Sequence, residues 1–284
     1  MDLRSIARKV NQGEFHYVLG RFRTVRKTYS GVRRLAATFG RQAASVPRTK
    51  TMFSGVDIAE IVRTIREEAV FVGLHLPADI VADIRAFAES EPLHAIYDPN
   101  GPTFRYADVV RGKSSDGRVI PVGGVRDPSR CPAIKSVIDD PVLRDIAREY
   151  LGHEPRRILT LLSWSFASEM TDEDRRQLKH HVIDYHYDVE GYNFVYASFY
   201  ITDTDRDSGA HVMMKRSHNK KPLKMLLGSV TASEAAVRKQ FGRENEIMIE
   251  GAAGTGFVQD TSCFHRATPP LRKDRLMLAV RFVN

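Results

Sequence analysis

Residues 183–191 read Ile-Asp-Tyr-His-Tyr-Asp-Val-Glu-Gly, a run in which ionisable and apolar side chains alternate. In a β-strand, side chains two residues apart point to the same face. His186 and Asp188 would therefore present an imidazole and a carboxylate side by side. Such a pair is two thirds of the 2-His-1-carboxylate arrangement that holds Fe(II) and leaves coordination positions open. A partly buried histidine that bonds to its neighbours is the alternative, and the tripeptide alone leaves both interpretations open.

The third ligand has to come from further along the chain. The histidines that follow this pair are His211, His218 and His265. His265 comes after a predicted strand and a turn, so it lies on a loop from which it can reach a metal held by an earlier strand. His211 lies in a predicted strand at the wrong place for the triad, and His218 is interpreted as a structural or supporting residue. The predicted metal ligands are therefore His186, Asp188 and His265.

The predicted secondary structure changes character along the chain. Residues 56–92 look helical, and Asp140 begins a further helix that has a proline at its first position and ends at Gly152. Residues 95–133, rich in Gly and Pro, predict long loops with short strands. From Arg156 onward the residues favour β-strands, and residues 172–181 are predicted to form a polar loop. The predicted strands are 158–167, the His186 stretch, 194–202, 210–214, 246–250, 257–260 and 275–283.

This order predicts the fold class. Helices come first, and some seven or eight strands follow, interrupted by one short helix that a capping box at residues 231–234 begins. We predict a mainly β fold with flanking helices: a double-stranded β-helix (jelly roll, cupin-like) with N-terminal helices packed on one sheet. The mouth of such a barrel can hold a metal.

The last predicted strand alternates between two kinds of side chain. One set, which should face the packed side, is Leu276, Leu278, Val280 and Phe282. The other set, which should face the barrel interior, is Arg275, Met277, Ala279 and Arg281. An interior arginine is costly unless an anion neutralises it, and a carboxylate can accept two parallel hydrogen bonds from it. A dicarboxylate that chelates the metal through a 2-oxo acid could place its far carboxylate on Arg275, with Arg281 as second choice. Surface or interstrand ion pairs of both arginines are the alternative.

The positive charge of the chain is concentrated at its beginning. Residues 1–50 contain 12 basic and two acidic residues, a net charge of +10, whereas the other 234 residues together carry −2. Residues 1–40 are predicted to form a basic amphipathic helix, so we divide the chain into an arm and linker, 1–54, and one domain, 55–284. The arm either rests on anionic lipid or an acidic partner, or packs on the body with a solvated basic face. Because the body is not basic, we expect no nucleic-acid partner.

Cysteine content and the lengths of the apolar runs indicate the cellular compartment. Cys131 and Cys263 form no framework, which favours a reducing environment and no structural zinc. No apolar run approaches the roughly 20 residues of a membrane helix, and the N-terminus lacks the apolar core of a secretory signal. We therefore expect a cytoplasmic protein, with peripheral contact at the inner face of the membrane as the role of an arm that binds lipid.

Together, the His186-x-Asp188 pair, the distal His265 and Arg275 resemble the phytanoyl-CoA dioxygenase-like branch of the Fe(II)/2-oxoglutarate oxygenases. The resemblance covers about residues 57–284. Supporting segments that look like those of the family are 147–152, 200–203, 207–209, 215–218 and 256–260, with Arg216 where glycine is usual. Two positions depart from the family: Ala267 stands where Ser or Thr is common, and Ser198 stands near the place of a tryptophan that contacts the cosubstrate.

The resemblance implies the chemistry. Fe(II) would be held by the three predicted ligands, 2-oxoglutarate and O₂ would take the open positions, and Arg275 with Ser198 would contact the cosubstrate. The expected reaction hydroxylates an unactivated C–H bond of a small-molecule, lipid- or carrier-linked substrate and releases succinate and CO₂. Because members that transfer halide lack the carboxylate of Asp188, hydroxylation is favoured. Aromatic residues that could line the substrate pocket, or simply fill the core, are Trp164, Tyr185, Tyr187, Tyr196 and Tyr200. A catalytically idle barrel that docks to a membrane or complex through its basic arm is the alternative function.

Overall fold

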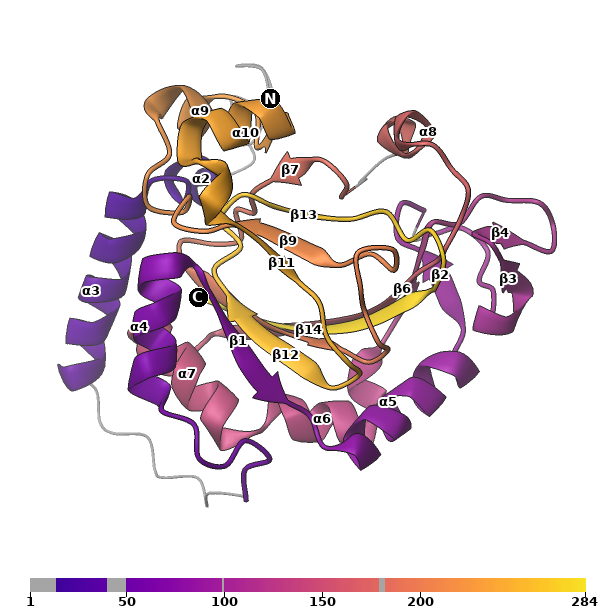
Figure 1. Cartoon of the computed structure of the whole chain (residues 1–284). Helices are drawn as coiled ribbons and strands as arrows, with labels where there is room; N and C mark the ends of the chain where they lie inside the picture. Colours follow the sequence, from indigo (N-terminus) through magenta and orange to yellow (C-terminus); the bar gives the residue numbers. More distant parts are fainter. Residues whose placement is uncertain (1–13, 40–49, 99, 179–181) are drawn as a thin grey trace.

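The computed structural model of the chain describes residues 14–39, 50–98, 100–178 and 182–284. Two antiparallel sheets lie opposite each other, and a layer of helices covers the outer face of the larger one (Figure 1). None of the described helices is long and apolar enough to cross a membrane. Cys131 and Cys263 are both buried and form no disulfide.

The larger sheet has seven strands and contains the last strand of the chain near its centre. β14 pairs with β8 on one side and with β6 on the other, so that Ala279 lies between Ser198 and Leu161. In spatial order the strands are β1 (Val70–His75), β12 (Thr255–Gln259), β8 (Phe194–Tyr200), β14 (Arg275–Val283), β6 (Arg157–Ser165), β5 (Val122–Val125) and β2 (Leu93–Ala95).

The smaller sheet has five short strands and carries the histidines. His265 opens β13 and lies across from His186 on β7 and Met213 on β9. In spatial order the strands are β10 (Thr231–Ala232), β7 (Tyr185–His186), β13 (His265–Ala267), β9 (His211–Met214) and β11 (Glu246–Ile249). A separate pair joins β3 (Val109–Val110) and β4 (Lys113–Ser114).

Four helices pack their apolar faces on the larger sheet: α4 (Ile58–Glu68), α5 (Ala78–Ser90), α6 (Pro132–Ile138) and α7 (Pro141–Leu151). Ile65 of α4 and Ile146 of α7 share one buried cluster with Leu278 and Phe282 of β14. Burial of this apolar surface is the main favourable term in forming the layered fold. The predicted mainly β fold with helices on one sheet is therefore confirmed.

Helix α7 begins and ends at the predicted residues. The Asp140 side chain accepts a hydrogen bond from the Val142 N–H, and Gly152 ends the helix in the left-handed region at φ +83°. A β-carbon at Gly152 would lie 3.2 Å from the Ser30 carbonyl oxygen of the neighbouring helix. The glycine is therefore required both by its backbone angle and by close packing.

Two glycine substitutions are expected to shift stability in opposite directions. Gly152→Ala should lower the free energy of unfolding by about 1–2 kcal/mol, because an alanine is strained in the left-handed region. Gly31→Ala should raise it by about 0.5–1 kcal/mol, because Gly31 lies inside a helix with open space at its β-carbon position. Urea denaturation of both variants measures the two changes, and shifts of the same sign would contradict this account.

Several predicted elements need correction. Residues 70–75 were predicted to be helical but form β1, because Ala69 adopts a left-handed conformation that ends α4 and the β-branched Val70 follows. Part of the predicted polar loop is a short helix, α8 (Asp172–Gln177), begun by a capping box between Thr171 and Asp174. After β7 come α9 (Leu223–Leu227), which was not predicted, and α10 (Glu234–Phe241). The side chain that caps α10 is that of Ser233.

The N-terminal segment forms two described helices where one was predicted. They are α2 (Phe15–Leu19) and α3 (Arg23–Phe39), while residues 1–13 of the predicted arm and 40–49 of the predicted linker lie outside the described residues. Helix α3 lies beside α4 and α7 (Figure 1), and its Tyr29 ring stacks on Tyr192 at 5.0 Å between ring centroids. The described part of the segment is therefore in contact with the body; the predicted boundary at residue 54 stays a prediction.

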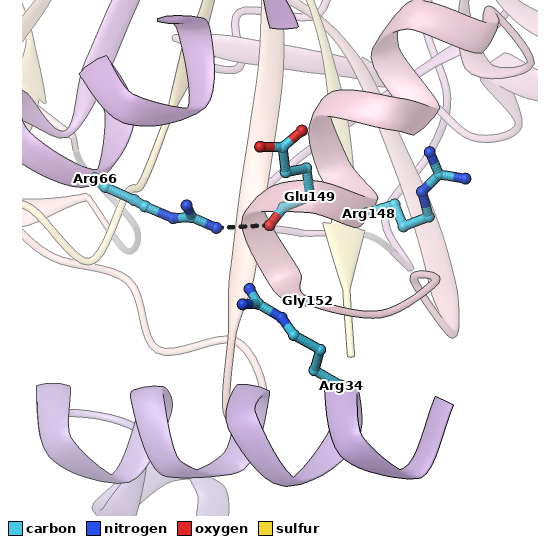
Figure 2. A pocket seen from close by; sticks show the side chains of 5 residues that line it. All are labelled: Arg34, Arg66, Arg148, Glu149 and Gly152. Carbon is cyan, nitrogen blue, oxygen red and sulfur yellow. Dashed lines mark hydrogen bonds between the residues drawn. The ribbon is translucent and has the colours of Figure 1, made fainter. Parts of the chain in front are cut away.

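Figure 2 shows how α3, α4 and the end of α7 meet around a hollow of about 240 Å³. Arg66 of α4 donates a hydrogen bond to the carbonyl oxygen of Glu149, at 2.7 Å, near the end of α7. Arg34 of α3 reaches towards Gly152 from the other side. Guanidinium groups suit this place because the C-terminus of a helix presents unpaired carbonyl groups and a partial negative charge. The arginines thus join α3 and α4 to α7.

Candidate metal centre

The three predicted ligands lie together in the structure. One ligand atom from each of His186, Asp188 and His265 can be chosen so that all three lie within 4.8 Å of one another. The two imidazole rings are 4.3 Å apart between centroids, and His265 Nε2 is 3.8 Å from Asp188 Oδ2. Among the described residues, this is the one group of three His, Cys, Asp or Glu side chains close enough to share a metal ion.

Backbone carbonyls fix which nitrogen each histidine offers. Nδ1 of His186 lies 3.0 Å from the carbonyl oxygen of Asp184, and Nδ1 of His265 lies 3.0 Å from that of Cys263. A carbonyl can only accept a hydrogen bond, so Nδ1 carries the hydrogen and the Nε2 lone pair is left for a metal. Burial, followed by the nearby His186, lowers the pKa of His265 to about 4, so this ring is neutral near pH 7.

Local structure differs slightly from the prediction at two ligands. Strand β7 ends at His186, so Asp188 lies just past it, and its N–H donates to the carbonyl oxygen of Thr261 at 2.8 Å. His265 was predicted on a loop but is the first residue of β13. Pairing of β13 with β7 sets His265 directly opposite His186. The register of two short strands therefore brings together ligands that are 79 positions apart in the chain.

A cavity of about 790 Å³ opens between the two sheets beside these residues. Its wall includes the four side chains of β14 that were predicted to face the interior: Arg275, Met277, Ala279 and Arg281. The opposite set on β14 is buried in the helix-covered core, as predicted. Of the predicted aromatic residues, Tyr187 and Tyr196 line the cavity, whereas Trp164, Tyr185 and Tyr200 pack in the interior outside it.

Arg275 is a buried cation in this wall, only 5% exposed. Its guanidinium donates to Ser165 Oγ at 3.0 Å and to the carbonyl oxygen of Gly209, and both partners are neutral. Its Nε has no hydrogen-bond partner, and no described carboxylate forms an ion pair with it. Burial lowers the pKa of Arg275, although the group keeps its charge near neutral pH. A buried guanidinium without a counter-ion is costly, so this position favours an anionic ligand.

Arg281, the second candidate for the same task, already has a carboxylate. Its Nη1 lies 3.8 Å from Glu190 Oε2, and its guanidinium lies over the Tyr196 ring at 5.2 Å from the centroid. The Tyr196 hydroxyl donates to the same carboxylate. The environment therefore distinguishes the two arginines: Arg281 is neutralised by Glu190, and Arg275 is not.

Ser198, predicted to contact a cosubstrate, lines the cavity from β8. Its hydroxyl accepts a hydrogen bond from Gln259 Nε2 at 3.1 Å. Ala267 and Thr268, at the position where the family differs from this chain, line the cavity too. The contact between Ser198 and a cosubstrate stays a prediction.

His211 is a wall residue that the sequence interpretation missed. It does not belong to the three-ligand group, but its ring stacks on His265 at 5.3 Å between centroids, and it lines the cavity. Burial and the neighbouring His265 hold the pKa of His211 well below its ordinary value, so a neutral imidazole faces the cavity. The alternation of the predicted strand 210–214 was the available signal, because Met213 pairs with His265 and a residue two positions away shares its face. His218, by contrast, bonds to the Arg66 carbonyl oxygen and is structural, as predicted.

The comparisons with known proteins give matches only in structure. No family model matches the chain, and no curated protein matches its sequence. EctD from S. alaskensis, solved with 2-oxoglutarate and 5-hydroxyectoine, superposes with a TM-score of 0.55 at 16% identity, covering 86% of this chain and 85% of EctD. The epimerase SnoN, solved with Fe³⁺, alpha-ketoglutarate and nogalamycin RO, gives 0.53 at 15% identity, with 80% and 83% covered.

EvdO2 from Micromonospora carbonacea var. aurantiaca, solved with 2-oxoglutarate, gives a TM-score of 0.52 at 13% identity and covers 82% of this chain and 93% of its own. Identities this low carry information about the fold alone. The chain has the jelly-roll fold of these proteins, in agreement with the fold that its sequence predicted.

Proposed function

We propose that the chain is an Fe(II)- and 2-oxoglutarate-dependent oxygenase. One observation carries the proposal: two histidines and one aspartate converge on the wall of a cavity that also holds a buried arginine without a carboxylate partner. The first feature suits a metal that needs open coordination positions, and the second suits the far carboxylate of a dicarboxylate cosubstrate. Structural neighbours solved with Fe³⁺ or 2-oxoglutarate support the same assignment.

The donor set fits ferrous iron. Two imidazole nitrogens and one carboxylate oxygen, with three positions left open, are typical of non-haem Fe(II) oxygenases, whereas structural zinc sites are closed by four protein ligands. His186, Asp188 and His265 would hold the ion, and the carbonyl groups behind both rings would keep Nε2 directed at it. When bound, iron, 2-oxoglutarate and O₂ supply the oxidising chemistry, with succinate and CO₂ as products of the cosubstrate.

The chain's own residues bind and orient. Arg275 would hold the far carboxylate of 2-oxoglutarate, and Ser198 lies on the same wall. Apolar side chains such as Ile183, Val189 and Leu161 line other parts of the cavity and would exclude water from the substrate. A cavity of about 790 Å³ suits a small molecule or the reactive end of a lipid- or carrier-linked one.

Within this class, we propose hydroxylation of an unactivated C–H bond as the outcome. The carboxylate of Asp188 supports hydroxylation over halide transfer. Structural neighbours described as an epimerase and a carbocyclase have the same fold, so the outcome has to be read from the product. Mass spectrometry of metabolites incubated with the protein would distinguish a gain of one oxygen from loss of two hydrogens or unchanged mass.

Succinate release tests the class itself. The purified chain, supplied with Fe(II), ascorbate, 2-oxoglutarate and O₂, should form succinate, and a chelator should stop it. Conversion of 2-oxoglutarate to succinate without oxidation of a substrate would also be detected, so the assay does not require the substrate. Succinate at the level of the iron-only control, together with no binding of 2-oxoglutarate in calorimetry, would overturn the proposal.

We propose as a second function that the exposed face of α3 contacts an anionic membrane. Val32 and Leu35 are 59% and 62% exposed, and Arg23 and Lys27, earlier on the same helix, are exposed too. Apolar and basic side chains on one helix suit a lipid surface, at roughly 1 kcal/mol per basic residue. Sedimentation with phosphatidylserine vesicles should retain the chain, and the double variant V32Q/L35Q should bind several-fold more weakly. Equal sedimentation of both with neutral and anionic vesicles would contradict it.

A further inference from the structure

The turn at residues 260–263 touches two of the three ligands through its backbone. The carbonyl oxygen of Thr261 accepts from the Asp188 N–H at 2.8 Å, and that of Cys263 lies 3.0 Å from His265 Nδ1. The first contact fixes the backbone position of Asp188. The second fixes the rotation of the His265 ring. A shift of this turn would therefore displace both ligands together.

Asp260 fixes the turn from inside. Its Oδ1 accepts from the Ser262 N–H at 2.9 Å, and its carbonyl oxygen accepts from the Cys263 N–H at 3.0 Å. Asp260 as a whole is only 1% exposed. Burial alone would raise the pKa of Asp260, but the Arg26 guanidinium and hydrogen bonds from Tyr150 and Ser262 hold it well below its ordinary range. An ionised side chain thus lies under the turn.

The cation that neutralises Asp260 comes from the N-terminal helix, 234 positions earlier in the chain. Arg26 Nη2 donates to Asp260 Oδ2 at 2.9 Å and to Asn193 Oδ1 at 2.8 Å, and Nη1 donates to Ser262 Oγ. Its guanidinium lies over the Phe194 ring, 4.8 Å from the centroid, and the residue is only 7% exposed. The Arg26 side chain therefore bonds to two residues of the turn, Asp260 and Ser262, and to Asn193, the residue before β8.

Helix α3 is held so that Arg26 can reach this place. Tyr29 stacks on Tyr192 one turn later, and Arg34 meets the end of α7 two turns later (Figure 2). Arg23 and Lys27 lie on the exposed face of the same helix. Only one of these three neighbouring basic residues is therefore inserted into the body, and it bonds to the turn that carries the ligand contacts.

We infer that Arg26 is a positioning residue for the metal centre. It acts through Asp260 and Ser262 on the turn that orients Asp188 and His265, so one side chain of the N-terminal helix helps to order the metal ligands. The inference rests on the proposed function, because it presupposes a metal at the three ligands. Replacing a direct hydrogen-bond partner of a metal ligand typically changes metal affinity by about 10–100-fold, and Arg26 acts one contact further away.

Cobalt binding tests the inference without turnover. Co(II) would be titrated into the full-length protein, wild type and Arg26→Gln, with calorimetry for the Kd and visible absorption for the ligand geometry. We expect Arg26→Gln to weaken binding by about 10-fold, the lower end of that range, and to change the absorption bands. Lys27→Gln removes the same charge from the next position, on the exposed face, and should bind as the wild type does. Arg26→Lys should lie between, because an ammonium keeps the ion pair but cannot span Asp260, Ser262 and Asn193.

The outcomes distinguish failure of the positioning role of Arg26 from failure of the proposed oxygenase function. A folded Arg26→Gln that binds Co(II) with the wild-type Kd and spectrum would overturn the positioning role and leave the proposed function intact. Wild-type protein that binds Co(II) no more tightly than Asp188→Ala does would overturn both. If circular dichroism shows that Arg26→Gln does not fold, Arg26→Lys decides: a weakened Kd supports the role, and an unchanged Kd and spectrum overturn it.

Discussion

Asp188→Ala is expected to reduce Fe(II)-dependent succinate release by more than about 100-fold, to the background of iron alone. The substitution removes one of three converging ligands, and even residues one shell further out cost 10–100-fold in metal affinity or activity. Two histidines remain, so residual weak binding of metal is expected, but the ion is no longer fixed by three ligands. Succinate formation at saturating 2-oxoglutarate, measured with increasing Fe(II), checks the result.

Asp184→Ala is the matched control for this variant. Asp184 lies as close to His186 in the chain as Asp188 does, but its carboxylate pairs with Arg176 at 3.2 Å rather than joining the ligand group. Its contact with His186 runs through its backbone carbonyl oxygen, which the substitution keeps. Activity should therefore stay within a few-fold of the wild type. Equal loss in both variants would indicate general disturbance of this stretch and would count against Asp188 as a ligand.

Arg275→Gln is expected to raise the KM for 2-oxoglutarate by more than about 100-fold. Removing one partner of a buried charge pair costs about 3–5 kcal/mol, and each 1.4 kcal/mol is a factor of ten in affinity. Arg275→Lys should also be strongly impaired, because an ammonium cannot donate the two parallel hydrogen bonds of a guanidinium. Succinate release as a function of 2-oxoglutarate concentration measures KM and kcat separately.

Arg281→Gln provides the comparison, because it removes the same group from the same face of β14. Arg281 already lies near Glu190 and over Tyr196, so its loss should change the KM for 2-oxoglutarate only a few-fold. A larger effect at Arg281 than at Arg275 would mean that Arg281, not Arg275, binds the far carboxylate of 2-oxoglutarate. No effect at either position would remove the argument for a dicarboxylate cosubstrate.

Patterns that repeat along one element were enough to predict much of this fold. The alternation of β14 placed Arg275 and Ala279 on the cavity wall and Leu278 in the core, because a strand in a layered fold must bury one face against the helices. Asp140 and Gly152 marked the limits of α7 because capping chemistry is local. The β-branched and aromatic residues after Arg156 predicted the approximate limits of β6, β8, β9, β11, β12 and β14.

The errors arise where local signals conflict or where the answer lies far away in the chain. Val70–His75 follows a helix without a Gly or Pro signal, since the non-glycine Ala69 takes the left-handed conformation. Strand β7 has only two residues, so periodicity could not define its end relative to Asp188. Nothing near Arg26 in the sequence distinguishes it from Arg23, because its carboxylate partner is 234 positions away. Long-range pairing, not composition, decides which basic residue is buried.

The strand order of the larger sheet has a consequence for how fast the chain folds. Of its neighbouring pairs, only β5 and β6 are consecutive strands in the sequence, and the edge strand β1 pairs with β12, 180 to 189 positions later. Contacts of such high contact order form slowly, because a long loop must lose entropy before any pairing energy is gained. The metal ligands lie on β7, just after it and on β13, so they meet only when this long-range strand pair of the smaller sheet has formed. High-affinity metal uptake should therefore be among the last events of refolding, and its kinetics should report completion of the native topology.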